Sequence, residues 1–399
     1  MAGPFNWLSQ VTSVTAFGIQ SLPQRLGSSL TSMLGIAGVV AVMVAVLSIA
    51  QGIMQTMNNS ASVDNVVVLR SGSTSEMMSG LSGDETRFIA EGPGLARNET
   101  GSIASPELFV IINLLKKTTL TDANVPLRGV GKAAFDIRDT FRIVEGRMFE
   151  WGLNEVIVGI GARMEFEGLE LGSTIPVGQE EWPVVGVFEA GGGLAETEIW
   201  VDSAVLQPAY RRGNSYQSVY AKLESPESYQ AFKDALTSDP RLNVKPMRES
   251  EFYSSQSEML YNLITGLGTF IAVIMGFGAV FGALNTMYTA VSSRTREIAT
   301  LRALGFHSGP VVISVLTESM LLALAGGIIG AVAAWAVFDG FRAATVNMAS
   351  FSQVAFAFDV SASLLMQGVV FALIIGFIGG VFPAIRAARQ PVATALREL

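Results

Sequence analysis

The segment Val291–Phe306, VSSRTREIATLRALGF, separates two long apolar runs, and its pattern bears on whether these runs are membrane spans. Its charged side chains are three arginines and one acid: Arg294, Arg296, Arg302 and Glu297. Three of its apolar side chains recur at every third position and so line one side of a short helix: Ile298, Leu301 and Leu304. Gly305 follows, where the end of a helix commonly takes a left-handed residue. The pattern predicts a short, basic, amphipathic helix.

The apolar runs on both sides are long enough to cross a bilayer, so this helix is expected to hang between two membrane spans. Three interpretations are open from the pattern alone. The arginines only fix the topology of the loop, the helix lies on the bilayer surface, or it docks into another protein. Spacing by itself slightly favours the first.

The composition divides the chain into a membrane part and a soluble part. Half of the 399 residues are hydrophobic and 15% are charged, whereas about 25% charged residues is usual. Acidic residues outnumber basic ones between Thr56 and Ser255, and this acidity argues against a nucleic-acid partner, which requires a basic face. With no cysteine and one histidine, His307, we expect no disulfide framework and no histidine-based metal site or triad.

Four apolar stretches predict four membrane spans. Leu30–Ala50 has no charge over 21 residues, enough to cross a core of ~30 Å. The arginines beside the spans place both termini and the basic helix on the cytoplasmic side.

The predicted divisions are 1–29, a cytoplasmic or interfacial amphipathic helix with a frayed arm as the alternative; 30–59, the first span and a stalk; 60–249, an external domain; 250–291, a stalk and the second span; 292–310, the basic helix; 311–338, the third span; 339–363, an external loop; 364–385, the fourth span; and 386–399, a cytoplasmic tail.

Between residues 60 and 249 the pattern changes to that of an α+β domain. Short β-rich runs bounded by turn residues predict seven strands: Val63–Leu69, Leu108–Ile112, Glu155–Ile160, Thr174–Val177, Pro183–Phe188, Glu198–Val201 and Ser218–Lys222. Glu227–Leu236 is predicted to be helical. Ser71–Gly83 is rich in serine, glycine and methionine, which predicts a flexible loop or, alternatively, an apolar contact surface.

Three spans carry glycines four residues apart, a spacing that lets helix backbones approach closely: Gly278 with Gly282, Gly326 with Gly330, and Gly376 with Gly380. Packing within the chain is the commoner use of this spacing, and dimerisation the rarer one. Glu318 lies about two turns inside the third span, so its carboxylate reaches the interface or faces a partner.

Three glycine-containing stretches fail as nucleotide-binding motifs. Before Gly129–Lys132, Pro126 replaces the first glycine of a phosphate-binding loop, and Ala133 replaces the metal-binding Ser or Thr. Gly159 and Gly161 lack a third glycine, and Gly191–Gly193 is not followed by a nucleotide fingerprint. We therefore expect no catalytic residue and no ATP hydrolysis by this chain.

The residues of the basic helix carry a resemblance to a known family. R-x-R-E-I-A-x-L-R-A-L-G-F at Arg294–Phe306 resembles the cytoplasmic coupling helix of the FtsX-like permeases, which include MacB, LolC and LolE. The span Thr317–Gly330, the tail P-A-I-R-A-A-R-x-P-V and the order of spans are similar to that family, and Gly172–Glu189 is similar to its MacB-type periplasmic core. Ala299 departs from the family, which has glycine there.

The resemblance implies four membrane helices with a large α+β periplasmic domain of the MacB type between the first two. It implies a permease subunit of an ABC transporter in the bacterial inner membrane, which exports a hydrophobic or amphipathic substrate by mechanotransmission. Because no ATPase domain is evident, a separate ATPase dimer would bind ATP and Mg²⁺, and this chain would bind no cofactor. Other implied partners are a second permease copy, an adaptor with an outer-membrane factor, and membrane lipids.

Two alternatives remain from the resemblance: a lipoprotein-releasing permease of the LolC/LolE type, and a non-transporting transmitter that activates a cell-wall hydrolase. A bacitracin-sensor type is disfavoured, because those permeases have many more than four spans.

Overall fold

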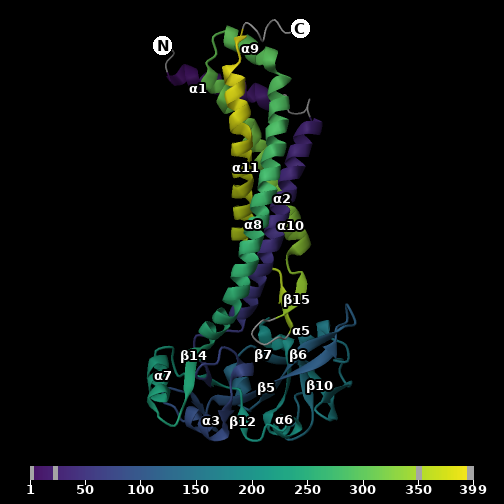
Figure 1. Cartoon of the computed structure of the whole chain (residues 1–399), viewed down its shortest axis with the longest axis vertical. Coiled ribbons are helices and arrows are strands. Elements are labelled where there is room, and N and C mark those ends of the chain that lie inside the picture. The colour runs from purple at the N-terminus through teal and green to yellow at the C-terminus, as the bar shows by residue number, and fades with distance from the viewer. Residues whose placement is uncertain (1–3, 21–25, 347–352, 393–399) are drawn as a thin grey trace. The chain divides into compact units, whose positions relative to one another are not determined.

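The computed structural model describes residues 4–20, 26–346 and 353–392, which form two compact units. The helical unit contains the described residues of 1–51, 263–341 and 358–399, and the sheet unit contains 52–262 and 342–357. The division falls inside two long helices, α2 (Leu26–Asn59) and α8 (Glu249–Ser292), each of which is helical on both sides of it. Figure 1 shows the elements of both units.

Within the described residues, four helices are candidate membrane spans, and most of their length lies in the helical unit. They are long and apolar enough to cross a bilayer: Gly27–Asn59 in α2, Leu260–Ser292 in α8, and the whole of α10 (Ser308–Phe338) and α11 (Ala362–Arg389). Their number and order confirm the predicted fold class. α1 (Pro4–Gln20) packs against the start of α10, where the Ser314 hydroxyl donates to the Val14 carbonyl at 3.1 Å. The frayed arm considered for this segment is therefore wrong for residues 4–20.

Glycines bring three of the long helices together. A Cβ added at Gly330 of α10 would lie 2.3 Å from the Ala37 carbonyl oxygen of α2, and one at Gly326 would lie 2.6 Å from the Met33 carbonyl oxygen. At Gly376 of α11 the added Cβ would lie 2.3 Å from the Ala323 Cβ of α10, and at Gly380 2.7 Å from the Ser319 Cβ. No larger residue fits these crossings without movement of a backbone.

Gly278 and Gly282 of α8 differ from the other two glycine pairs. Both are exposed, and among the described residues nothing lies within 4 Å of a Cβ added at either position. The packing within the chain that we predicted from their spacing is absent there.

The sheet unit is built on a ten-stranded mixed sheet with the order β14-β1-β13-β5-β6-β11-β8-β10-β7, and β9 pairs with β10. Its strands are β1 (Asn65–Arg70), β5 (Ala104–Leu115), β6 (Asp122–Val130), β7 (Phe141–Gly146), β8 (Val156–Gly159), β9 (Thr174–Val177), β10 (Glu180–Ala190), β11 (Ile199–Asp202), β13 (Ser218–Lys222) and β14 (Val244–Arg248). Helices α3 (Gly83–Ala90), α4 (Ala134–Ile137), α5 (Ile160–Glu165), α6 (Ser203–Ala209) and α7 (Ser228–Ser238) join them.

The two largest of the apolar clusters along this sheet lie over different strands. In one, Phe166, Trp182 and Leu206 pack with the buried side chains of β5, β6 and β8. In the other, Ile89 of α3 and Phe232 of α7 cover β1 and β13. Each predicted strand coincides with an observed one, but β6, β7 and β14 were not predicted, because their apolar residues alternate with charged ones or prolines.

Two segments differ from the sequence-based interpretation. Ser71–Gly83 is not a flexible loop along its whole length, because Glu76, in the single turn η2 (Glu76–Met78), is only 7% exposed and hydrogen-bonded. The predicted loop 339–363 contains two paired strands, β15 (Arg342–Val346) and β16 (Gln353–Ala357), and this pair belongs to the sheet unit.

Candidate functional site

The basic segment forms the short helix α9 (Thr295–Ala303) between α8 and α10. α9 lies at the end of the helical unit where α11 ends (Figure 1). Its C-terminus is closed by two backbone bonds, from Phe306 to the Leu301 carbonyl at 3.1 Å and from Gly305 to the Arg302 carbonyl at 3.1 Å. This is the double closure in which the residue after the helix takes a left-handed conformation, and Gly305 has a φ of +98°. The glycine therefore fixes the direction in which the chain enters α10.

Arg294 lies inside the helical unit. It is 9% exposed, and its Nη1 lies 2.9 Å from the Glu318 Oε2 of α10. Its Nη2 donates to the Phe17 carbonyl of α1 at 3.4 Å. If α9 docks into another protein, Arg294 is not available to that contact, because its guanidinium is already paired within the helical unit. A carboxylate as buried as that of Glu318, 3% exposed, is costly without a cation beside it.

The apolar ridge of the predicted helix is divided between the interior and the surface. Ile298 is 9% exposed and packs with Val291, Val311 and Ala387, whereas Leu304 is 73% exposed. Leu301 is half-buried. Three residues along a helix rotate the side chain by about 300°, so positions i, i+3 and i+6 spread over about 120° of the surface. Ile298 therefore holds α9 in place and is not available to a partner.

Arg302 connects α9 to the end of α11. Its Nη1 donates to the Gln390 carbonyl at 2.8 Å, and Gln390 caps the C-terminus of α11, where a cation is favoured. Among the side chains predicted for the site, Arg296, Glu297 and Leu304 are exposed. Together with Thr300 and Ala303 they form what we call the α9 surface: Arg296, Glu297, Thr300, Ala303 and Leu304.

The sheet unit holds a buried ionic cluster that sequence reasoning missed. Arg128 of β6 contacts three carboxylates at 2.6–2.9 Å: those of Glu76, Glu107 and Glu198. Arg138 pairs with Glu107 at 2.8 Å. Burial alone would raise the pKa of Glu76, but the charge of Arg128 and its hydrogen bonds outweigh burial and lower that pKa. The available signal was one arginine inside the apolar strand segment Val125–Val130.

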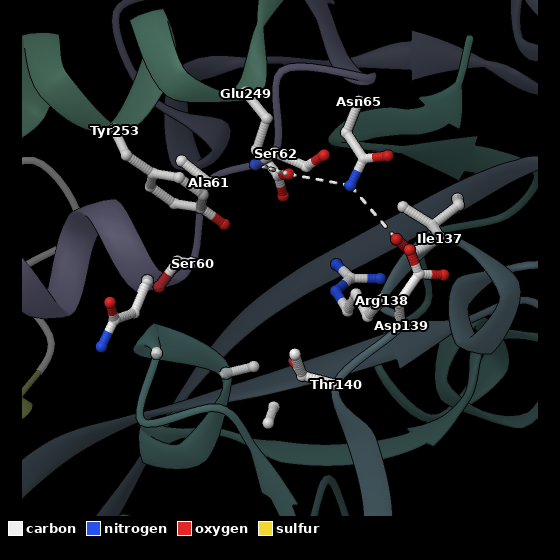
Figure 2. A pocket seen from close by; sticks show the side chains of 14 residues that line it. Ser60, Ala61, Ser62, Asn65, Ile137, Arg138, Asp139, Thr140, Glu249 and Tyr253 are labelled. Carbon is white, nitrogen blue, oxygen red and sulfur yellow. Dashed lines mark hydrogen bonds between the residues drawn. The ribbon is translucent and has the colours of Figure 1, made fainter. Parts of the chain in front are cut away.

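A polar cavity of about 230 Å³ lies beside this cluster, within the sheet unit. Figure 2 shows Ser60, Arg138, Glu249 and Tyr253 around it. Glu249, the first residue of α8, is 2% exposed; its Oε2 accepts from the Ser62 amide at 3.0 Å and from Asn65 Nδ2 at 2.9 Å. Burial raises the pKa of Glu249, and the charge of Arg138 offsets part of that rise. No group of three acidic or histidine side chains in the described ranges is placed to hold a metal ion.

Four apolar helices, a short basic helix between the second and third, and an α+β unit inserted after the first define a multi-span membrane protein with a large extramembrane domain. The MacB-like periplasmic core domain matches residues 29–239, and the FtsX-like permease C-terminal domain matches residues 269–392. The chain belongs to the MacB/FtsX-type permeases of ABC transporters.

The chain is similar to two curated relatives and to one solved structure, each at low sequence identity. The macrolide export ATP-binding/permease protein MacB of Chlorobium luteolum is 24% identical, over 95% of this chain and 59% of its own length. The chain thus spans about six-tenths of that relative. The uncharacterized ABC transporter permease YvrN of Bacillus subtilis is 25% identical, over 95% of this chain and 97% of its own length. A crystal structure of the periplasmic region of MacB from Actinobacillus actinomycetemcomitans is 13% identical, covers 51% of this chain and 96% of its own, and has a TM-score of 0.37.

Proposed function

We propose that this chain is the membrane subunit of an ABC transporter whose ATP hydrolysis occurs on a separate ATPase dimer. In this proposal the α9 surface docks on the ATPase, and the sheet unit changes conformation in response to export a hydrophobic or amphipathic substrate. α9 and both termini then face the cytoplasm of a bacterium, and the sheet unit lies in the periplasm. ATP and Mg²⁺ bind the ATPase, and a second permease copy completes the complex.

The observation that carries the proposal is the exposure of Leu304 beside charged groups. A large apolar side chain that is 73% exposed, with Arg296 and Glu297 nearby on α9, is the composition of a surface that docks a partner. Charges at the rim of such a contact orient it and speed association.

The way α9 is held favours transmission of force. Arg294 ties the start of α9 to α10 through Glu318, Ile298 packs into the helical unit, and Arg302 ties the last turn to α11. A displacement of α9 would therefore act on both helices at once.

Exchange of Leu304 for an acid tests the docking assignment. We expect Leu304→Asp to release the ATPase from detergent-solubilised complex, because the new carboxylate would be desolvated without a partner. Co-purification of the ATPase with the full chain is the measurement. Leu153→Asp, at a leucine that is 47% exposed on the sheet unit, is the matched control and should leave the yield unchanged. An ATPase that co-purifies with Leu304→Asp at full yield contradicts the assignment.

Export is preferred to signalling in this proposal because several relatives are named as macrolide export proteins. The macrolides in those names are said of the relatives, and we extend to this chain only the class of hydrophobic or amphipathic compounds. Purified complex in liposomes should move such a compound in an ATP-dependent way. An adaptor and an outer-membrane factor would act downstream of that step. Binding of a cell-wall hydrolase without any transport would favour the transmitter, and release of lipoproteins would favour the LolC/LolE type.

A further inference from the structure

One short turn of the sheet unit contacts residues next to three of the four places where the chain passes between this unit and the membrane spans. This turn, η3 (Leu194–Thr197), lies between β10 and β11. The three connections are the end of α2, the start of α8 and the strand β16. Each of them brings residues of the sheet unit against η3 or the glycines before it.

The ends of α2 and α8 meet at Leu194. The Leu194 amide donates to the Ser60 hydroxyl at 2.6 Å, directly after α2 ends. The Leu194 side chain, 7% exposed, packs with Met57 of α2 and Tyr253 of α8 in a small apolar cluster. A displacement of either helix at this end must therefore move Leu194 or break the cluster.

The third connection, β16, also contacts η3. β16 packs against η3, α5 and β6. A Cβ added at Gly161, in α5, would lie 3.6 Å from the Ala355 Cβ of β16 and 2.9 Å from the Glu196 carbonyl oxygen. Gly161 thus lies between β16 and η3.

This packing explains three of the glycines that failed as nucleotide motifs: Gly159, Gly161 and Gly193. A Cβ added at Gly159 would lie 2.2 Å from the Glu196 carbonyl oxygen, and one at Gly193 would lie 2.7 Å from the Ser60 hydroxyl and 3.1 Å from the Ser60 Cα. The Glu196 carboxylate closes the loop before η3 by accepting from the Ala190 and Gly192 amides at 2.9 and 2.7 Å. These glycines let η3 approach β8, α5 and the end of α2.

The cavity in Figure 2 borders the same turn. Ser60, Gly193 and Ala195 line it on the η3 side, and Glu249 and Tyr253 line it on the α8 side. Glu249 holds the start of α8 to the chain after α2 through the Ser62 amide. The end of α2 and the start of α8 are therefore connected to each other through Glu249 and Ser62, and both contact η3 beside the cavity.

We infer that η3 and its contacts, Met57, Ser60, Gly193–Thr197, Tyr253 and Ala355, are the junction through which movement of the membrane helices enters the sheet unit. This inference rests on the proposed mechanical coupling. It assigns to the η3 junction the positioning role that couples α2, α8 and β16 to strands β8, β10 and β11.

Two variants uncouple the junction in different ways. Leu194→Ala removes the side chain between Met57 and Tyr253, and Gly193→Ala places a methyl group against Ser60. Leu153→Ala, at an exposed leucine, and Gly80→Ala, where nothing lies within 4 Å of the added Cβ, are the matched controls. Hydrogen–deuterium exchange of the full complex in lipid nanodiscs, with and without a non-hydrolysable ATP analogue, is the measurement.

In the wild type and in both controls we expect the analogue to change exchange in α9 and in the strands of the sheet unit. In Leu194→Ala and Gly193→Ala the change in α9 should remain and that in β8, β10 and β11 should be lost, while exchange without nucleotide stays native in β5 and β6. A response in the sheet unit that keeps its wild-type size in both variants overturns the junction. A wild-type complex in which α9 does not respond contradicts the proposed coupling itself.

Discussion

The helical unit and the sheet unit each bury an arginine, but they do so with different numbers of partners. Arg294 has one buried carboxylate, that of Glu318, at 2.9 Å, the exposed carboxylate of Glu297 at 3.6 Å, and a backbone carbonyl at 3.4 Å. Arg128 has three carboxylates within hydrogen-bonding distance, and its guanidinium also lies 5.1 Å from the ring centre of Phe109 and 5.5 Å from that of Tyr220.

The difference shows how each unit is held together. Arg128 joins the segment after β1, the strand β5 and the residue before β11, so one guanidinium fixes three segments that are distant in the sequence. Arg294 joins α9 to its neighbours by far fewer bonds. We therefore expect the sheet unit to move as a body and α9 to be the more easily displaced of the two.

The largest expected effect comes from removing the cation of the cluster. Arg128→Met leaves Glu76, Glu107 and Glu198 buried without their shared partner, and breaking a buried pair in this way costs about 3–5 kcal/mol. Chemical denaturation of the full chain in detergent, followed by the fluorescence of the buried tryptophans Trp182 and Trp200, measures the loss.

The matched control for this substitution is an exposed pair on the same sheet. Arg142 is 73% exposed and pairs with Glu189 at 2.6 Å, so Arg142→Met should cost about 0–1 kcal/mol. Equal losses for the two variants would mean that the cluster around Arg128 contributes no more than a surface pair.

A smaller effect is expected at the pair in the helical unit. Arg294→Met leaves one buried carboxylate without its cation, where Arg128→Met leaves three, so we expect a loss of about 1–3 kcal/mol. In Arg294→Met/Glu318→Gln the uncompensated charge is gone, and part of the loss should be recovered. Thermal unfolding of single and double variants in detergent measures both. If the double variant were no more stable than Arg294→Met, the pair would not be what stabilises the start of α9.

The sequence predicted the elements better than it predicted which charges are buried. The four spans and α9 follow from long uncharged runs and from arginines with a closing glycine, which are local signals. Arg128 becomes buried only because Glu76 and Glu198 approach it from 52 and 70 residues away. The placement of the β15–β16 pair in the sheet unit and the inward turn of Arg294 likewise depend on distant partners, so charge and spacing alone indicated solvent or another protein.

The smallest expected effect is on the pH dependence of the sheet unit, where two acids should act in opposite directions. The pKa of Glu76 is lowered on folding, so its contribution to stability is complete above the ordinary value of 4.5 and is lost as pH falls through the folded pKa. The pKa of Glu249 is raised, so its contribution is complete below 4.5 and is lost as pH rises through the folded pKa. Glu249→Gln should therefore flatten the fall in unfolding free energy as pH rises above 4.5, and Glu76→Gln should flatten only the loss below pH 4.5. Denaturation curves at a series of pH values distinguish the two, and an unchanged profile above pH 4.5 in Glu249→Gln would show that this carboxyl is not penalised by its burial beside the cavity.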